Sequence, residues 1–141
     1  MLVVFIINTL LLTLAVLVHY EFLYHITSYL PKSNFRPRAR ILIGVFGALL
    51  AHVVEVWLFG AAYFFMNAHE AFGYLSGNFD GSWWDSIYFS FTVYTTVGFG
   101  DVEPHGHLRF LTGIESLVGL VLITWTASFL YLEMRRYWNM L

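Results

Sequence analysis

The sequence predicts an all-α membrane protein, with three transmembrane helices and a shorter helix that enters the bilayer without crossing it. Of its 141 residues 59% are hydrophobic and 11% are charged, whereas an ordinary soluble domain has about 25% charged residues. The hydrophobic residues gather in long runs, and about 20 of them are enough for a helix to cross the hydrocarbon core. The chain has no cysteine, which excludes disulfides and thiolate metal sites. Its net charge of −2 indicates no acidic or basic partner, and we expect no nucleic acid.

Three stretches are long enough to span a bilayer, since at about 1.5 Å per residue each exceeds the ~30 Å of hydrocarbon. Residues 1–30 begin with an almost uninterrupted apolar run and should form a peripheral N-terminal helix. We expect this helix to be retained, because no basic segment follows Met1 and no small-residue cleavage site follows the run. It lacks arginines at every third position, which excludes a voltage sensor. The other two spans are residues 41–66 and 108–134.

A fourth apolar stretch, residues 82–94, is too short to cross, because its roughly twelve apolar residues extend only ~18 Å as a helix. Ser82 followed three positions later by Asp85 predicts a capping box at its start. Directly after it, residues 95–101 read Thr-Thr-Val-Gly-Phe-Gly-Asp. Small β-branched residues alternating with glycine suit an extended backbone whose carbonyls turn toward one axis, and rings of such carbonyls can replace the water around an ion.

This heptapeptide and its surroundings resemble the potassium channel pore-domain family, in its two-helix form with one extra N-terminal transmembrane helix. The motif differs at one letter from the commonest filter, with Phe99 where many members have tyrosine, and Pro104 matches a proline that often follows the filter aspartate. The resemblance covers roughly residues 38–136. It implies a pore domain over residues 41–136, divided into an outer helix (41–66), an outer loop (67–81), a pore helix (82–94), a selectivity filter (95–101) and an inner helix (108–134).

The resemblance also implies a role for each filter residue. Successive potassium ions would bind the backbone carbonyls of Thr96, Val97, Gly98 and Phe99, and the Thr96 hydroxyl would close the innermost site. Thr95 and Gly100 complete the ion-binding segment, and glycine at positions 98 and 100 allows dihedrals that a Cβ would penalise. Because each chain carries one filter strand, the resemblance implies a homotetramer in the lipid bilayer. Potassium would be the permeant ion, and we expect no cofactor and no enzymatic activity.

The residues around the filter depart from the family's commonest pattern, in which a pore-helix acid and a tryptophan brace the filter aspartate. Nine residues before Asp101 stands Thr92, so no second carboxylate is expected. Thirteen residues before it stands Tyr88, whose hydroxyl we expect to hydrogen-bond Asp101. Ten residues before Phe99 stands Phe89, where a tyrosine–tryptophan hydrogen bond would otherwise form. Packing alone should therefore hold the aromatic residues around the filter.

Basic residues predict the orientation of the chain. Four of them lie within residues 31–40, and Arg135 and Arg136 follow the third span. The positive-inside rule places this basic loop and the tail, residues 137–141, in the cytoplasm. The N-terminus then lies outside the plasma or inner cell membrane, and the filter enters from the outer side as the resemblance requires. Acidic residues gather around this outer mouth, where a ring of them would attract cations: Glu70, Asp80, Asp85, Asp101 and Glu103.

Three ionisable residues fall inside the second and third spans, namely His52, Glu55 and Glu115. Intramembrane ionisable groups are costly and usually face the protein interior. One interpretation is that they hydrogen-bond the helices together, a second is proton sensing, and a third is a metal or enzymatic site, since histidine and glutamate are ligand types. Gly119 also has two interpretations, close helix packing or a hinge of the kind that the family often has at this level.

Three functions follow from these observations. The first is a potassium-selective channel, and the second is a weakly selective cation channel, because a filter sequence alone does not fix its geometry. The third is a membrane metal-binding or enzymatic bundle that uses His52, Glu55 and Glu115. A channel of this kind would be gated through the filter, the inner helix, lipid, pH or a separately encoded regulator.

Overall fold

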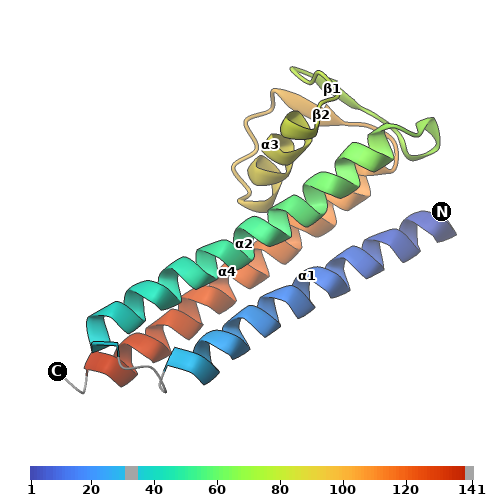
Figure 1. Ribbon diagram of the computed structural model, residues 1–141. Helices are drawn as coiled ribbons and strands as arrows, with labels where there is room; N and C mark the ends of the chain where they lie inside the picture. The colour runs from blue at the N-terminus through green and yellow to red at the C-terminus, as the bar shows by residue number, and fades with distance from the viewer. Residues whose placement is uncertain (31–34, 139–141) are drawn as a thin grey trace.

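Three long helices lie side by side in the structure, a computed structural model that describes residues 1–30 and 35–138 (Figure 1). They are α1 (Leu2–Tyr29), α2 (Pro37–Asn67) and α4 (Leu108–Trp138). Each contains a stretch long and apolar enough to cross a membrane, of 28, 30 and 29 residues respectively. The predicted all-α membrane fold is therefore confirmed. Lys32 of the basic loop and residues 139–141 of the tail lie outside the described residues.

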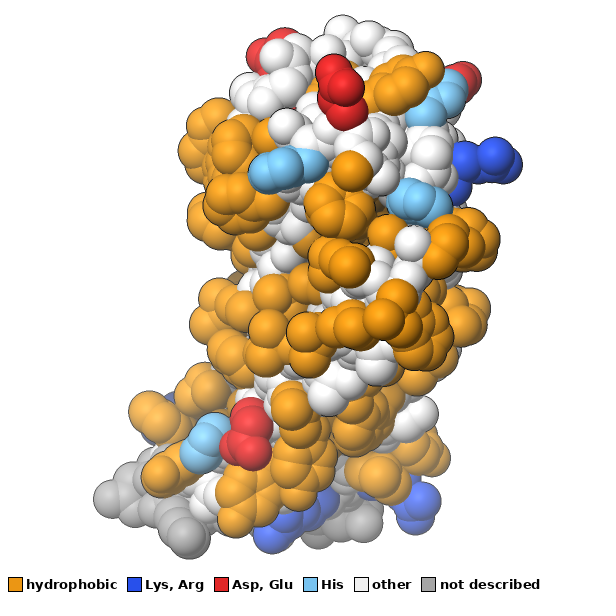
Figure 2. Space-filling view, turned by 90° about the vertical axis from the view of Figure 1, so that its right-hand side faces the viewer, with side chains coloured by type: hydrophobic (Ala, Val, Ile, Leu, Met, Phe, Trp, Pro, Cys, Tyr) orange, Lys and Arg blue, Asp and Glu red, His pale blue; other side chains and the backbone are white. Residues whose placement is uncertain are grey.

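The surface of the three long helices is apolar, as a bilayer requires. Large hydrophobic side chains such as Phe5, Phe46 and Leu117 are exposed, whereas Glu55 and Glu115 are completely buried. Hydrophobic side chains cover the middle of the face in Figure 2, and charged side chains gather toward its two ends. In lipid this arrangement turns apolar groups toward the acyl chains and ionisable groups toward the protein interior.

The N-terminal helix packs on its own chain. α1 runs antiparallel to α2 and contacts both α2 and α4 (Figure 1). Glycine at position 47 of α2 permits this approach, because a Cβ there would lie 2.7 Å from the Ile26 side chain of α1. Gly44, one turn earlier, lies instead toward Leu130 of α4. Gly44 and Gly47 of α2 therefore lie against two different neighbouring helices, α4 and α1.

The short helix α3 (Trp83–Tyr94) packs against α2 and α4 and has only 12 residues. Its N-terminus is capped by Ser82, whose Oγ accepts a hydrogen bond from the Asp85 N–H at 3.1 Å. The predicted capping box is only half formed, because the Asp85 carboxylate accepts from the Asp80 N–H at 2.9 Å instead. The Ser82 N–H donates to the Asp80 carboxylate at 2.7 Å. Two carboxylates thus hold the chain that leads into α3.

A two-stranded antiparallel sheet, which the sequence did not predict, joins the segments on either side of α3. β1 (Leu75–Gly77) follows a 3-10 turn (Glu70–Phe72), and β2 (Val102–Pro104) follows Asp101. Glycine is required at Gly77, because its φ is 93° and a Cβ would lie 2.2 Å from the Asp101 carbonyl oxygen. The expected outer loop is therefore structured, and it fixes the outer end of residues 95–101.

Candidate functional site

The backbone of residues 95–101 alternates between positive and ordinary φ. Positive values occur at Thr96 (60°), Gly98 (53°) and Gly100 (77°), but not at Val97 or Phe99 between them. In a uniform strand successive carbonyls point to opposite sides, whereas alternation between the left-handed and right-handed regions turns them to the same side. The segment can therefore present a row of carbonyl oxygens along one line.

Thr96 is a β-branched residue in the left-handed region, and such a conformation costs about 1–3 kcal/mol. Two backbone hydrogen bonds to the end of α3 hold the chain in place. The Thr96 N–H donates to the Val93 carbonyl at 2.9 Å, and the Gly98 N–H donates to the Thr92 carbonyl at 3.1 Å. The inner end of the segment thus continues directly from the C-terminus of α3. The two hydrogen bonds to this terminus stabilise the strained backbone at Thr96.

The other side of the segment has no neighbour within the described part of the chain. Residues 95–100 are exposed, and the exposed fractions of Val97 and Phe99 are 56% and 69%. A Cβ at Gly98 or Gly100 would meet no atom within 4 Å. Val97 and Phe99 thus form an exposed apolar surface, which is typical of an interaction or ligand site.

The outer end of the segment is held by Asp101. The Tyr88 hydroxyl donates a hydrogen bond to Asp101 Oδ2 at 2.8 Å, which is the contact that the thirteen-residue spacing predicts. The Asp101 carbonyl accepts from the Asn78 N–H at 2.7 Å. These two bonds connect Asp101 to α3 on one side and to the structured outer loop on the other.

Thr92 and Phe89, the other two predicted supports, contact different partners. The Thr92 hydroxyl donates to the Phe89 carbonyl in its own helix at 2.8 Å, so Thr92 supports the segment through its backbone carbonyl alone. The Phe89 ring packs edge-on against Tyr63 of α2, with 4.9 Å between the ring centroids. Within the described residues, Phe89 therefore anchors α3 to α2.

Gly119 of α4 lies against the C-terminal end of α3. A Cβ there would be 2.2 Å from the Tyr94 carbonyl oxygen and 3.0 Å from its carbonyl carbon. Ser116, one turn earlier, donates to the Val93 carbonyl at 3.3 Å. Gly119 therefore lies in a close contact between α4 and α3, and its role as a hinge stays a prediction.

Glu115 is completely buried and joins three helices. Its Oε1 accepts a hydrogen bond from the Ser90 hydroxyl of α3 at 2.5 Å, and its Oε2 accepts from the Tyr63 hydroxyl of α2 at 2.6 Å. The Ser90 hydroxyl also lies 2.8 Å from the Val56 carbonyl. Both carboxylate oxygens are thus occupied by helix-to-helix hydrogen bonds.

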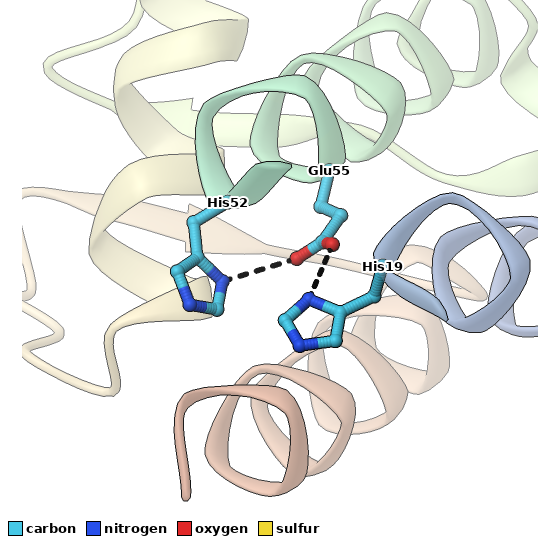
Figure 3. A group of neighbouring side chains, drawn as sticks. All are labelled: His19, His52 and Glu55. Atoms are coloured by element: carbon cyan, nitrogen blue, oxygen red, sulfur yellow. Dashed lines mark hydrogen bonds and ion pairs between the residues drawn. The ribbon is translucent and has the colours of Figure 1, made fainter. Parts of the chain in front are cut away.

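His52 and Glu55 do come together, but the third member of their group is His19 of α1 and not Glu115 (Figure 3). His19 Nδ1 lies 2.9 Å from Glu55 Oε1, and His52 Nδ1 lies 3.1 Å from Glu55 Oε2. Within the described residues, no hydrogen bond joins Glu115 to His52 or Glu55, and all three side chains contact groups of other helices, as the first interpretation predicts. His19 could have been found as the first histidine or charged residue in an apolar run.

Comparison with known proteins gives two matches. The family described as "Ion channel" matches residues 51–135. A stretch of 50 residues is 46% identical to the "Uncharacterized membrane protein YdjJ" of Bacillus subtilis (strain 168) and covers 35% of this chain but 15% of that protein. No solved structure matches the chain significantly.

Proposed function

Because the chain belongs to the ion channel family, we propose that it conducts potassium ions passively and selectively through the segment of residues 95–101. The observation that carries this proposal is the alternating backbone of Thr96, Gly98 and Gly100. It supports a row of carbonyl oxygens in the sequence context that resembles a potassium filter. The chain is an integral membrane protein, and the proposal assigns it no catalysed reaction and no cofactor.

The carbonyl oxygens of Thr96, Val97, Gly98 and Phe99 would replace the hydration shell of successive ions, with the Thr96 hydroxyl at the inner end. The α3 helix supports this arrangement, because its C-terminal carbonyls carry partial negative charge that favours a cation. Its last residue, Tyr94, directly precedes the segment. The ion path would thus begin where the helix dipole is most favourable.

A single chain supplies one row of carbonyls, and a ring requires several. The open side of residues 95–100 supports the proposal that four copies assemble around a common axis. The exposed apolar side chains of α4, among them Leu117, Leu120 and Val121, would line the pore or contact neighbouring copies. A homotetramer in the bilayer is therefore part of the proposal.

The proposed orientation puts the outer sheet and the N-terminus outside the cell membrane. Arg36 and Arg136 lie at the ends of α2 and α4 that are remote from residues 95–101, and basic residues favour the cytoplasmic side. Asp101 and Glu103 lie on the opposite side, next to the proposed outer mouth. A separately encoded regulator is compatible with this arrangement.

A weakly selective cation channel is the second candidate. The observation that favours it is that Tyr88 provides the side-chain hydrogen bond to Asp101 at an exposed position, while Phe89 packs against Tyr63. A filter supported in this way would be less rigid, and selectivity depends on the number and field of the coordinating carbonyls.

Flux measurements in liposomes test the proposal. The purified protein is reconstituted, and potassium and sodium fluxes are compared for the wild type and for Gly98→Asp. Gly81→Asp is the matched control, because Gly81 also has positive φ (81°) and open surroundings but lies outside the segment. We expect potassium flux that excludes sodium, is lost in Gly98→Asp and persists in Gly81→Asp. Equal fluxes would favour the second candidate, and no flux from intact tetramers would overturn both.

A further inference from the structure

Five polar side chains meet in the interior of the bundle, where α1, α2, α3 and α4 come together. We call them the histidine cluster, which consists of His19, His52, Glu55, Tyr94 and Thr126. His19 and Glu55 are completely buried, and the exposed fraction of Thr126 is 8%. The proposed conduction mechanism uses none of these side chains, and Figure 3 shows both imidazoles directed at the Glu55 carboxylate.

The two histidines present the same nitrogens to the same partners. Both Nδ1 atoms face Glu55, at 2.9 Å from His19 and 3.1 Å from His52. Both Nε2 atoms face the Thr126 hydroxyl oxygen, at 3.2 Å and 3.0 Å respectively. The Tyr94 hydroxyl donates to Glu55 Oε2 and lies 2.9 Å from His52 Nδ1. The two Nδ1 atoms and the Tyr94 hydroxyl thus surround Glu55, and we call this the inner side of the cluster. The two Nε2 atoms and Thr126 form its outer side.

Protons on neutral imidazoles do not satisfy all of these contacts. His52 Nδ1 could accept a hydrogen bond from the Tyr94 hydroxyl, but its contact with Glu55 then has no proton, because a carboxylate only accepts hydrogen bonds. In the other arrangement both Nδ1 atoms donate to Glu55, and each neutral imidazole has used its one proton. Both Nε2 atoms are then acceptors, but the Thr126 hydroxyl can donate to only one of them. One buried contact is left without a proton, which is costly in this environment.

We propose that the histidine cluster binds a divalent metal ion of the zinc type through His19 Nδ1, His52 Nδ1 and Glu55. Two imidazoles and a carboxylate are an established kind of zinc ligand set. One ligand atom from each of the three residues lies within 4.8 Å of the other two, and the Nδ1 atoms are 2.9 Å and 3.1 Å from Glu55 oxygens. A tetrahedral site with bonds of about 2.0–2.1 Å needs separations of roughly 3.3 Å. The Tyr94 hydroxyl contacts Glu55 Oε2 and His52 Nδ1 beside these ligands.

A metal ion on the inner side, next to Glu55, also removes the buried contact that lacks a proton. It occupies the lone pairs of both Nδ1 atoms, so each imidazole carries its proton on Nε2. Both Nε2–H groups then donate to the two lone pairs of Thr126 Oγ1. Outer hydrogen bonds of this kind orient the ligands of protein metal sites. One extra proton could satisfy Thr126 as well, and the experiment below separates the two occupants.

His52 is partly exposed on the single chain, whereas His19 and Glu55 are completely buried. The exposed fraction of the His52 side chain is 16%, and together with Tyr94 and Thr126 it lines a cavity of about 610 Å³. A metal held here would connect α1, through His19, to the residue that directly precedes Thr95. The N-terminal helix would thus be attached to the inner end of residues 95–101.

Metal content measures this directly and does not depend on ion selectivity. The full chain is purified with a tag that contains no histidine, treated with a chelator and dialysed against Zn²⁺, or against Co²⁺ as a spectroscopic probe. We expect about one Zn²⁺ per chain and a Co²⁺ absorption band typical of tetrahedral nitrogen and oxygen ligands. His52→Gln should lower the affinity by more than the ~10–100-fold that loss of an outer-shell partner causes, and His19→Gln should do the same.

His25→Gln is the matched control, because His25 lies on the same helix as His19 but its side chain is 58% exposed. It should bind Zn²⁺ as the wild type does, and Zn²⁺ should raise the unfolding temperature of both. A wild type that binds no stoichiometric Zn²⁺ or Co²⁺ overturns the proposal, even where a histidine variant fails to fold. Equal binding by wild type and a folded His52→Gln also overturns it.

Discussion

Gly119→Ala tests how closely α4 packs on the end of α3. The added Cβ would lie 2.2 Å from the Tyr94 carbonyl oxygen, 3.0 Å from its carbonyl carbon and 3.2 Å from its Cα. All three are backbone atoms, so no side-chain rotation can relieve the contact. Since atoms pack at ~3.5 Å, α4 must move by roughly 1 Å away from the residues that precede Thr95.

The expected magnitude follows from two opposing terms. Overpacking of this kind costs about 1–3 kcal/mol, whereas alanine in place of a helical glycine gains about 0.5–1 kcal/mol. Gly113→Ala is the matched control on the same helix, because a Cβ there meets no atom within 4 Å. The control should stabilise the protein slightly. Because the gain from alanine occurs in both variants, they should differ by roughly 1–3 kcal/mol in the free energy of unfolding.

This difference is measured by unfolding both variants in the same detergent and monitoring the loss of helix by circular dichroism. Potassium flux of both variants is measured separately in liposomes. Packing predicts that Gly119→Ala loses stability and flux together. A hinge predicts altered flux at unchanged stability. If Gly119→Ala is as stable as Gly113→Ala, Gly119 does not pack against Tyr94 as closely as the structure indicates.

Three further substitutions test other contacts. Tyr88→Phe removes the hydrogen bond to Asp101 at an exposed site, so the free energy of unfolding should change by less than about 1 kcal/mol. The ratio of potassium to sodium flux should nevertheless fall. Tyr74→Phe is the control and should leave that ratio unchanged. Glu115→Gln replaces an acceptor oxygen by an amide N–H facing a hydroxyl donor and should cost about 1–3 kcal/mol in thermal unfolding. Glu103→Gln, at an exposed position of β2, should not have this effect. Gly77→Ala should destabilise more than Gly81→Ala, since both have positive φ but only Gly77 would clash with Asp101.

Hydrophobicity and length were sufficient to predict the helices. Lipid selects long apolar runs, so the observed α2 and α4 contain the predicted residues 41–66 and 108–134 and extend only a few residues further. The contact between Tyr88 and Asp101 was also predictable, because both residues belong to one short segment with a known pattern.

The sheet and the position of His19 could not be predicted in this way. β1 and β2 have three residues each and pair across α3, so neither shows a periodic pattern, and their pairing depends on the close approach at Gly77. His19 and Glu55 meet only because two antiparallel helices adopt one particular register. The apolar composition of α1 indicates that it spans the bilayer, but it does not determine which residues of α2 it contacts.

The two buried glutamates explain how that register is determined. Packing of apolar helices in lipid has little hydrophobic driving force, because the acyl chains are as apolar as the side chains. Hydrogen bonds are directional and are satisfied in one register only. Glu115 binds Ser90, and Glu55 binds Tyr94 one turn further along α3. These carboxylates come from α4 and α2, so α3 is held from both sides immediately before residues 95–101. The position of the proposed potassium path therefore depends on two buried groups that are not part of that path.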